Sequence, residues 1–238
     1  MRVLFKKTVK ISLLLLTVVM ITLRSETTTA SSTQQNQVWA TIAATGDFNQ
    51  TNPLFARLTY LLEAQQRLID NASQTLLRPG IGYNLTPTTS MWLGYAYIYT
   101  KPPFPEPSFV ENRIWQQLLW SRDYSHWTLT SRSRLEERFI QPVASTLFRF
   151  RELIKIVIPA TTDSNFSFVA SDEIFWHIND FDGWQKQGLD QNRFFIGFRN
   201  QITKTLHTEI GYMNQFINVL NRENLTRHTV SINFLFNY

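Results

Sequence analysis

Apolar and polar residues alternate with a period of two along most segments of the chain. In the last segment, every second residue is apolar or aromatic: Val230, Ile232, Phe234, Phe236 and Tyr238. The residues between them are polar, with the single exception of Leu235. Arg193–Arg199 and Thr128–Phe139 follow the same period, with arginines on the polar positions. Such alternation predicts β-strands that have one apolar face and one polar face.

Turn-rich clusters separate these segments every ten to twenty residues and leave segments of about 10–14 residues between them, a length typical of tilted transmembrane strands. Eleven candidate segments begin near Val38, Phe55, Gln74, Met91, Glu111, His126, Thr146, Phe166, Gln191, Leu206 and Arg227. Single-chain bacterial barrels have even strand numbers. We therefore predict an all-β, antiparallel transmembrane barrel of ten or twelve strands. Either one segment, first of all the one near Val38, does not span, or one segment hides a pair.

Two segments are ambiguous. Leu54–Leu77 is rich in Leu, Ala, Gln, Glu and Arg, which favour helices. Met91–Thr100 is aromatic on both faces, so its orientation is not predicted.

The first thirty residues have a different character. Four basic residues among the first ten precede a 13-residue apolar run, Ile11 to Leu23, and a small-residue stretch follows. This order is typical of a secretory signal peptide, with cleavage expected between Ala30 and Ser31. We therefore expect a signal peptide at 1–30 and a barrel at 31–238. The alternative is an uncleaved membrane anchor, although 13 residues fall short of the roughly 20 that a spanning helix needs.

The export signal also accounts for most of the basic charge. The chain has 23 basic and 18 acidic residues, and residues 1–30 hold five of the former and one of the latter. The remainder therefore carries a net charge of only about +1, which removes the electrostatic basis for binding nucleic acid. With no cysteine, neither disulfides nor thiolate metal sites can form.

Alternation alone does not say whether the apolar face meets a core or lipid, because soluble and membrane barrels share this pattern with opposite orientation. Three features favour a membrane barrel: the export signal without cysteine, the arginines and glutamates on the polar face, and the aromatic C-terminus. A strand that ends on Tyr238 resembles the C-terminal signal that the barrel-assembly machinery of Gram-negative bacteria recognises. A lipid-facing band with aromatic girdles would also explain the 18 Phe, 8 Tyr and 7 Trp. We therefore expect the bacterial outer membrane as location and its lipid as a partner; the oligomeric state is not predicted.

A series of short motifs carries a more specific resemblance. In chain order they are residues 63–67 (EAQQR), 77–83 (LRPGIGY), 93–95 (LGY), 132–138 (RSRLEER), 148–151 (FRFR), 172–175 (DEIF), 191–193 (QNR) and 211–213 (GYM). Their order and spacing resemble a bacterial envelope family catalogued as domain of unknown function 2490, from about Val38 to Tyr238. The resemblance implies an outer-membrane barrel without an established activity and supplies no catalytic residue.

If the apolar face meets lipid, the charged residues of the other face point into the lumen, where arginine and glutamate form charge-assisted pairs. We expect this polar network to comprise Arg57, Glu63, Arg67, Arg132, Arg134, Glu136, Arg138, Arg149, Arg151, Glu173, Arg193 and Glu209. It would either plug the barrel as a structural element or line a narrow pore or binding cleft with a positive bias.

The alternative function is an outer-membrane lipid hydrolase or acyltransferase, which needs a nucleophile and a base on the lipid-facing surface. The chain has four histidines, His126, His177, His207 and His228. His228 has outward parity, but the nearby Ser231 has the opposite parity, so no dyad is predicted. No motif for a metal or a cofactor is present either, since residues 180–183 (DFDG) lack the rest of a calcium loop and the glycines near Pro79 lack a phosphate-loop context.

Overall fold

The computed structural model describes residues 33–238, except 49–51, 53–54, 71, 104–105, 142–144, 162–163, 181–185 and 221–222. The expected signal peptide and its cleavage position lie outside the described residues. In the described part of the chain, no helix is long and apolar enough to cross a membrane.

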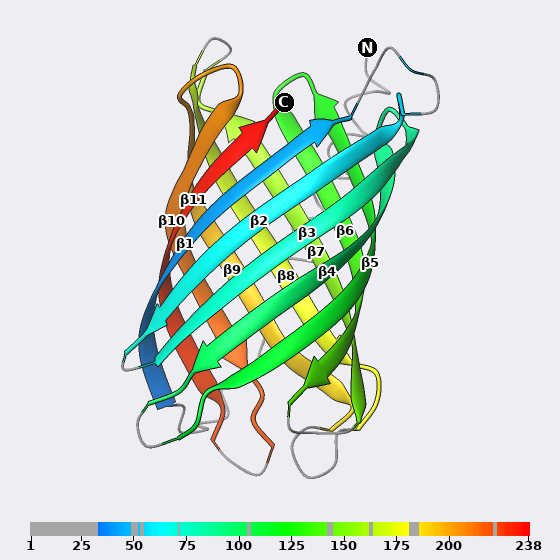
Figure 1. Cartoon of the computed structure of the whole chain (residues 1–238). Helices are drawn as coiled ribbons and strands as arrows, with labels where there is room; N and C mark the ends of the chain where they lie inside the picture. Colours follow the sequence, from blue (N-terminus) through cyan, green and yellow to red (C-terminus); the bar gives the residue numbers. More distant parts are fainter. Residues whose placement is uncertain are drawn as a thin grey trace, which may run out of the picture. The chain divides into compact units, whose positions relative to one another are not determined.

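The described residues form one closed β-barrel (Figure 1). Its eleven strands are β1 (Thr33–Asp47), β2 (Leu58–Ile69), β3 (Ala72–Thr86), β4 (Thr89–Lys101), β5 (Phe109–Tyr124), β6 (Trp127–Ile140), β7 (Thr146–Pro159), β8 (Phe166–His177), β9 (Gly188–Gln201), β10 (Leu206–Ile217) and β11 (Leu225–Asn237). Each strand pairs in antiparallel fashion with the next one along the chain. The barrel closes where β1 lies beside β11, and these two strands are parallel.

The predicted strand number was wrong, and so was the prediction that every pair is antiparallel. All eleven predicted segments are strands, and their starts differ from the predicted ones by at most five residues, at Val38 against Thr33. The segment that was expected not to span is β1, which pairs with β2 on one side and with β11 on the other. Consecutive strands alternate in direction, so with eleven strands the first and the last run the same way. The sheet therefore closes through one parallel pair.

The ambiguous segments are strands as well. The helix formers of Leu54–Leu77 lie largely in β2 and β3, which a tight turn at Asp70, with φ at 44°, connects. In β4, Ala96 and Ile98 are buried, whereas Tyr95 and Tyr97 are exposed on the outer face.

The two faces of the sheet differ sharply in burial. On the outer face of β9, Ile196 is 49% exposed and Phe198 is 59% exposed. On the inner face, Arg134 and Glu136 of β6 are 2% and 1% exposed. Apolar side chains therefore cover the outside, and charged side chains are enclosed. The C-terminal alternation follows this rule: Val230, Phe234 and Tyr238 are exposed on the outer face, and Ile232 and Phe236 are half-buried.

Three carboxylates interrupt the apolar outer face. Glu152 of β7 accepts hydrogen bonds from Ser131 Oγ at 2.8 Å and from Ser133 Oγ at 2.5 Å. Asp172 of β8 accepts one from Asn192 Nδ2 at 2.7 Å, and Glu137 of β6 accepts one from the side chain of Gln116. Each outward carboxylate thus has a neutral hydrogen-bond donor on an adjacent strand.

Glycine pairs make room for aromatic rings inside the barrel. Gly80 of β3 and Gly94 of β4 lie opposite each other, and the indole of the buried Trp115 covers both. A Cβ at Gly80 would lie 2.7 Å from this ring, and a Cβ at Gly94 would lie 2.1 Å from it, distances that no relaxed structure permits. The motifs at 77–83 and 93–95 therefore keep these two positions open for one tryptophan.

The two ends of the barrel are distinct. At one end, the upper one in Figure 1, β11 finishes at Asn237 and a two-residue turn links β3 to β4. We call this the C-terminal end. The opposite end carries the β4–β5, β6–β7, β8–β9 and β10–β11 connections and the first residue of β1, and we call it the cavity end.

Candidate functional site

The inner face of β5 to β9 holds a connected set of ion pairs, which we call the central network. Its members are Glu111 and Arg113 of β5, Arg132, Glu136 and Arg138 of β6, Arg149 and Arg151 of β7, Glu173 of β8 and Asp190 of β9. The period of two places these side chains on the inner face, and the register between the strands places them at similar heights along the barrel. Arg134 lies opposite Arg151, and Glu136 lies opposite Arg149.

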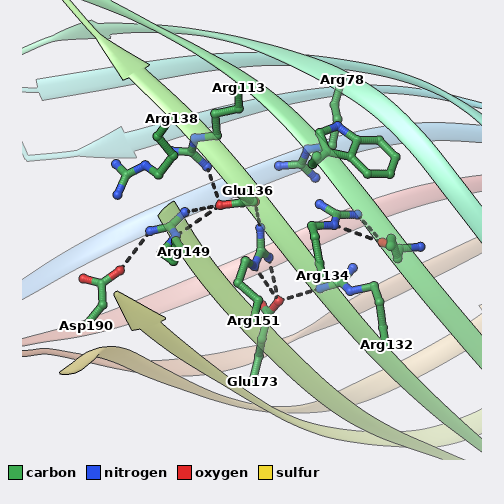
Figure 2. Close-up of polar contacts among 12 residues, drawn as sticks. Arg78, Arg113, Arg132, Arg134, Glu136, Arg138, Arg149, Arg151, Glu173 and Asp190 are labelled. Atoms are coloured by element: carbon green, nitrogen blue, oxygen red, sulfur yellow. Dashed lines mark hydrogen bonds and ion pairs between the residues drawn. The ribbon is translucent and has the colours of Figure 1, made fainter. Parts of the chain in front are cut away.

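Glu136 is the hub of the central network (Figure 2). Its Oε2 accepts from Arg149 Nη2 at 2.6 Å, and its Oε1 accepts from Arg151 Nη1 at 2.5 Å. Arg113 Nη1 lies 3.5 Å from Oε2. One carboxylate with 1% exposure therefore faces three guanidinium groups. Burial of these charges is tolerated because each of them has a partner of opposite charge.

The other carboxylates extend the network toward both neighbours of Glu136. Glu173 accepts from Arg151 and Arg132, each at 2.6 Å. Glu111 accepts from Arg113 Nε at 2.6 Å and from Arg138 Nε at 2.5 Å.

Asp190 reaches the central network through its bond with Arg149 Nη1 at 2.9 Å. The buried His177 Nε2 lies 3.3 Å from the other oxygen of Asp190. The five-strand sheet segment is thus cross-linked through side chains as well as through its backbone.

The remaining residues of the expected lumen network lie around this centre. Glu63 of β2 accepts from Arg78 of β3 at 2.7 Å. Arg134 donates to Gln117 Oε1, and its guanidinium carbon lies 4.3 Å from the centroid of a Trp115 ring. Arg57, in contrast, is exposed in the turn before β2 and does not enter the interior.

Glu209 belongs to a separate cluster near the C-terminal end. It accepts from Lys155 Nζ at 2.7 Å and from the side chain of Arg199, so three strands contribute to this cluster. Together with the central network it places ion pairs at two heights of the interior.

Arg67 and Arg193 belong to the inner arginines that have no close carboxylate among the described residues, as do Arg134 and Arg227, which donate to Gln117 and Gln35. Arg67 of β2 donates to the amide oxygens of Gln65 and Gln74, at 2.7 and 2.9 Å. Among the described residues, Arg193 of β9 has one ionic neighbour, Glu173, at 3.9 Å.

A cavity of about 1140 Å³ opens between these two arginines and the cavity end. Its deep part is formed by Arg78, Arg113, Arg149, Arg151 and Arg193, with Gln191 and Gln215. Eight arginines and three carboxylates line it, and Glu63, Glu136 and Glu173 pair with some of these arginines from outside the lining, so the cavity keeps an excess of positive charge. An arginine-rich wall of this kind can bind oxyanions through bidentate hydrogen bonds.

The sequence did not single out several members of this site. Arg78, Glu111, Arg113, His177 and Asp190 were absent from the expected network. Glu111 and Arg113 were detectable in principle, because they stand two apart at the start of a predicted segment. Asp190 was not, since an irregular register between Phe175 and Trp176 shifts the start of β9.

The four histidines do not form a catalytic group. His228 faces outward and bonds through Nδ1 to the Tyr212 hydroxyl at 2.6 Å, whereas Ser231 is buried on the inner face. His126 lies in the exposed β5–β6 turn, and His207 lies at the start of β10 near the C-terminal end. No group of three His, Asp or Glu side chains in the described part of the chain is placed to hold a metal ion.

Comparison with known proteins gives a family without an assigned activity. The family model described as protein of unknown function (DUF2490) matches residues 36–226, which span β1 to the start of β11. An uncharacterized protein of Methylorubrum extorquens is 28% identical over 214 residues, covering 88% of this chain and 90% of the relative. No solved structure matches significantly. The expected resemblance is therefore confirmed, and the chain belongs to the DUF2490 family.

Proposed function

We propose that this protein is an integral outer-membrane β-barrel whose interior is closed at mid-height by the central network and opens only as the cavity at one end. The observation that carries the proposal is the orientation of the two faces. A water-soluble barrel encloses its apolar side chains, and here Ile196 and Phe198 are exposed while Arg134 and Glu136 are enclosed. An outward apolar surface around a polar interior is what a bilayer requires of a barrel.

The filling of the interior supports a closed barrel over an open pore. Trp115 and Phe175 are fully buried at the level of the central network, and Arg149 and Arg151 lie against the ring of Phe175. An eight-stranded barrel is just filled by its side chains, and eleven strands add only a modest width. The ion pairs of Glu136 and Glu173 occupy that width.

The outward carboxylates are compatible with this location because each one has a hydrogen-bond donor beside it. Acidic residues on a lipid face cost less than arginine or lysine, for which the penalty is about 2–4 kcal/mol at the midplane. Glu152, with two serine donors, is the clearest case.

Fractionation of the host envelope tests the location. We expect the full chain in the outer-membrane fraction, extractable only with detergent, and running faster on gels before heating than after it. Recovery of the protein in the soluble periplasmic fraction without detergent would overturn the proposal.

Conductance in planar lipid bilayers tests the closed interior. We expect the purified barrel to give no steps above the lipid background, and Glu136→Ala, which removes the hub, to raise the frequency of openings. Stable, uniform conductance steps from the unmodified protein would instead establish the second candidate function, a narrow pore. The positive charge of the cavity favours anions as its solutes.

A further inference from the structure

The cavity is lined by an arginine pair that has one distant carboxylate among the described residues, Glu173, which lies 3.9 Å from Arg193 and also pairs with two other arginines. The guanidinium carbon of Arg67 lies 3.9 Å from the centroid of the Trp39 ring, and that of Arg193 lies 5.0 Å from it. Two like charges therefore share one aromatic neighbour inside the barrel. Because like charges in an enclosed space repel each other, this pair is held in place by the fold with only that one distant, shared counter-charge among the described residues.

Hydrogen-bonding groups around this pair are also unsatisfied. Arg138 Nη1, Arg193 Nε and Gln215 Oε1 are buried and have no hydrogen-bond partner among the described residues, and all three residues line the cavity. Arg138 and Gln215 are more than nine-tenths buried. Buried polar groups are normally satisfied, so the two unsatisfied N–H donors, Arg138 Nη1 and Arg193 Nε, indicate a missing acceptor, whereas Gln215 Oε1 is itself an acceptor and lacks a donor. An oxyanion supplies acceptors and negative charge together.

The part of the cavity nearest its end has a different chemistry. The terminal residues of four strands are apolar there: Phe109 of β5, Ile140 of β6, Ile217 of β10 and Leu225 of β11. Pro102, Pro107 and Val219 of the adjoining connections add to this apolar collar. A solute that fills both parts has a charged group at its inner end and an apolar group at its outer end.

We propose that the cavity binds an oxyanion, a phosphate or a carboxylate, that carries an apolar substituent. The anion lies between Arg67 and Arg193 and accepts the free N–H groups, while the substituent contacts the apolar collar. The volume of about 1140 Å³ is sufficient for an organic solute, since ligand sites commonly measure 300–1,000 Å³. The binding site itself does not depend on the membrane location; only the side of the membrane that it faces rests on the proposed function.

Calorimetric titration of the barrel, folded in an uncharged detergent, tests the proposal. The probes are phenyl phosphate, phenylacetate, inorganic phosphate and the neutral benzyl alcohol. We expect phenyl phosphate to bind about tenfold more tightly than inorganic phosphate, because the ring buries apolar area in the collar. Phenylacetate distinguishes a carboxylate site from a phosphate site, and benzyl alcohol should not bind.

Three variants assign the binding to the arginine pair. Arg67→Gln and Arg193→Gln should each weaken phenyl phosphate by about tenfold or more, the equivalent of one charge-assisted hydrogen bond. Arg199→Gln removes the same charge near the C-terminal end and should leave the affinity within about twofold, since its partner Glu209 keeps Lys155.

Thermal unfolding of the ligand-free variants separates binding from structure. Each Gln variant relieves repulsion within the pair, so we expect its melting temperature to equal or exceed that of the unmodified barrel. A purely structural role predicts a lower melting temperature and unchanged affinity.

The site would be overturned if neither phenyl phosphate nor phenylacetate bound, or if both Gln variants kept the affinity of the unmodified barrel. Equal affinity for phosphate and phenyl phosphate would overturn the apolar part of the assignment. Because these measurements are made in detergent, their failure is distinct from a failure of the outer-membrane location.

Discussion

Replacement of Glu136 by glutamine is the most direct test of the central network. The change keeps the shape of the side chain and removes the charge that faces Arg113, Arg149 and Arg151. At an effective dielectric constant of about 20, each close pair contributes on the order of 4 kcal/mol of Coulomb energy. The carboxylate itself loses several kcal/mol of hydration on burial, which offsets part of this sum. We therefore expect Glu136→Gln to lower the free energy of unfolding by about 3–5 kcal/mol, the usual effect of removing one partner from a buried pair.

The assay is equilibrium unfolding in urea of the barrel in lipid vesicles, followed by tryptophan fluorescence. Glu223→Gln, an exposed acid in the β10–β11 connection, is the matched control and should change the stability by less than about 0.5 kcal/mol. Adding Arg151→Gln to Glu136→Gln should recover part of the loss, because a buried charge that has lost its Glu136 partner disappears while Glu173 keeps Arg132. A loss below about 1 kcal/mol for Glu136→Gln, or no recovery in the double variant, would refute the view that this carboxylate balances the interior charge.

Three further changes test other parts of the barrel. Ile196→Arg should lower the stability in vesicles by about 2–4 kcal/mol if the outer face meets lipid, whereas an aqueous face would limit the change to about 0.5 kcal/mol. Gly94→Val should cost about 1–3 kcal/mol and shift the tryptophan emission, because the new side chain overlaps Trp115; unchanged stability and emission would contradict that packing. Deletion of Tyr238 should reduce the heat-modifiable protein in the outer membrane, and an undiminished amount would contradict the assembly role of the last strand.

The strands themselves could be predicted because burial on one side of a sheet imposes a period of two. In β9 and β11, Ile196 and Phe234 mark the exposed face directly in the sequence. The orientation of β4 was not predictable, because tyrosines cover its outer face while apolar Ala96 and Ile98 occupy its inner one. In β4, the amino-acid types therefore do not show which face is the inner one.

The closure of the barrel and the partners of each arginine depend on relations between distant segments. No local pattern in β1 indicates that it pairs with β11, since this pairing is set by the number and tilt of all the other strands. Likewise, the sequence around Arg67 and Arg151 offers equal reasons to expect a carboxylate partner. Only the register decides that Arg151 faces Glu136 and Glu173 while Arg67 faces amides.

The parallel pairing of β1 with β11 affects how this fold could be rearranged. In a barrel with an even number of strands, the first and last strands are antiparallel, and a short turn can join their ends to give a circular permutant. Here Thr33 lies opposite Leu225 and Thr45 lies opposite Asn237, so the two ends of the paired stretch are separated by its full length. A linker from Asn237 back to Thr33 would have to run about 40 Å along the barrel wall, at about 3.3 Å per residue. A simple hairpin turn therefore cannot join the present ends of β1 and β11 in a circular permutant. Growth of the barrel by duplication of a hairpin adds two strands, so the number stays odd and the parallel pair is kept.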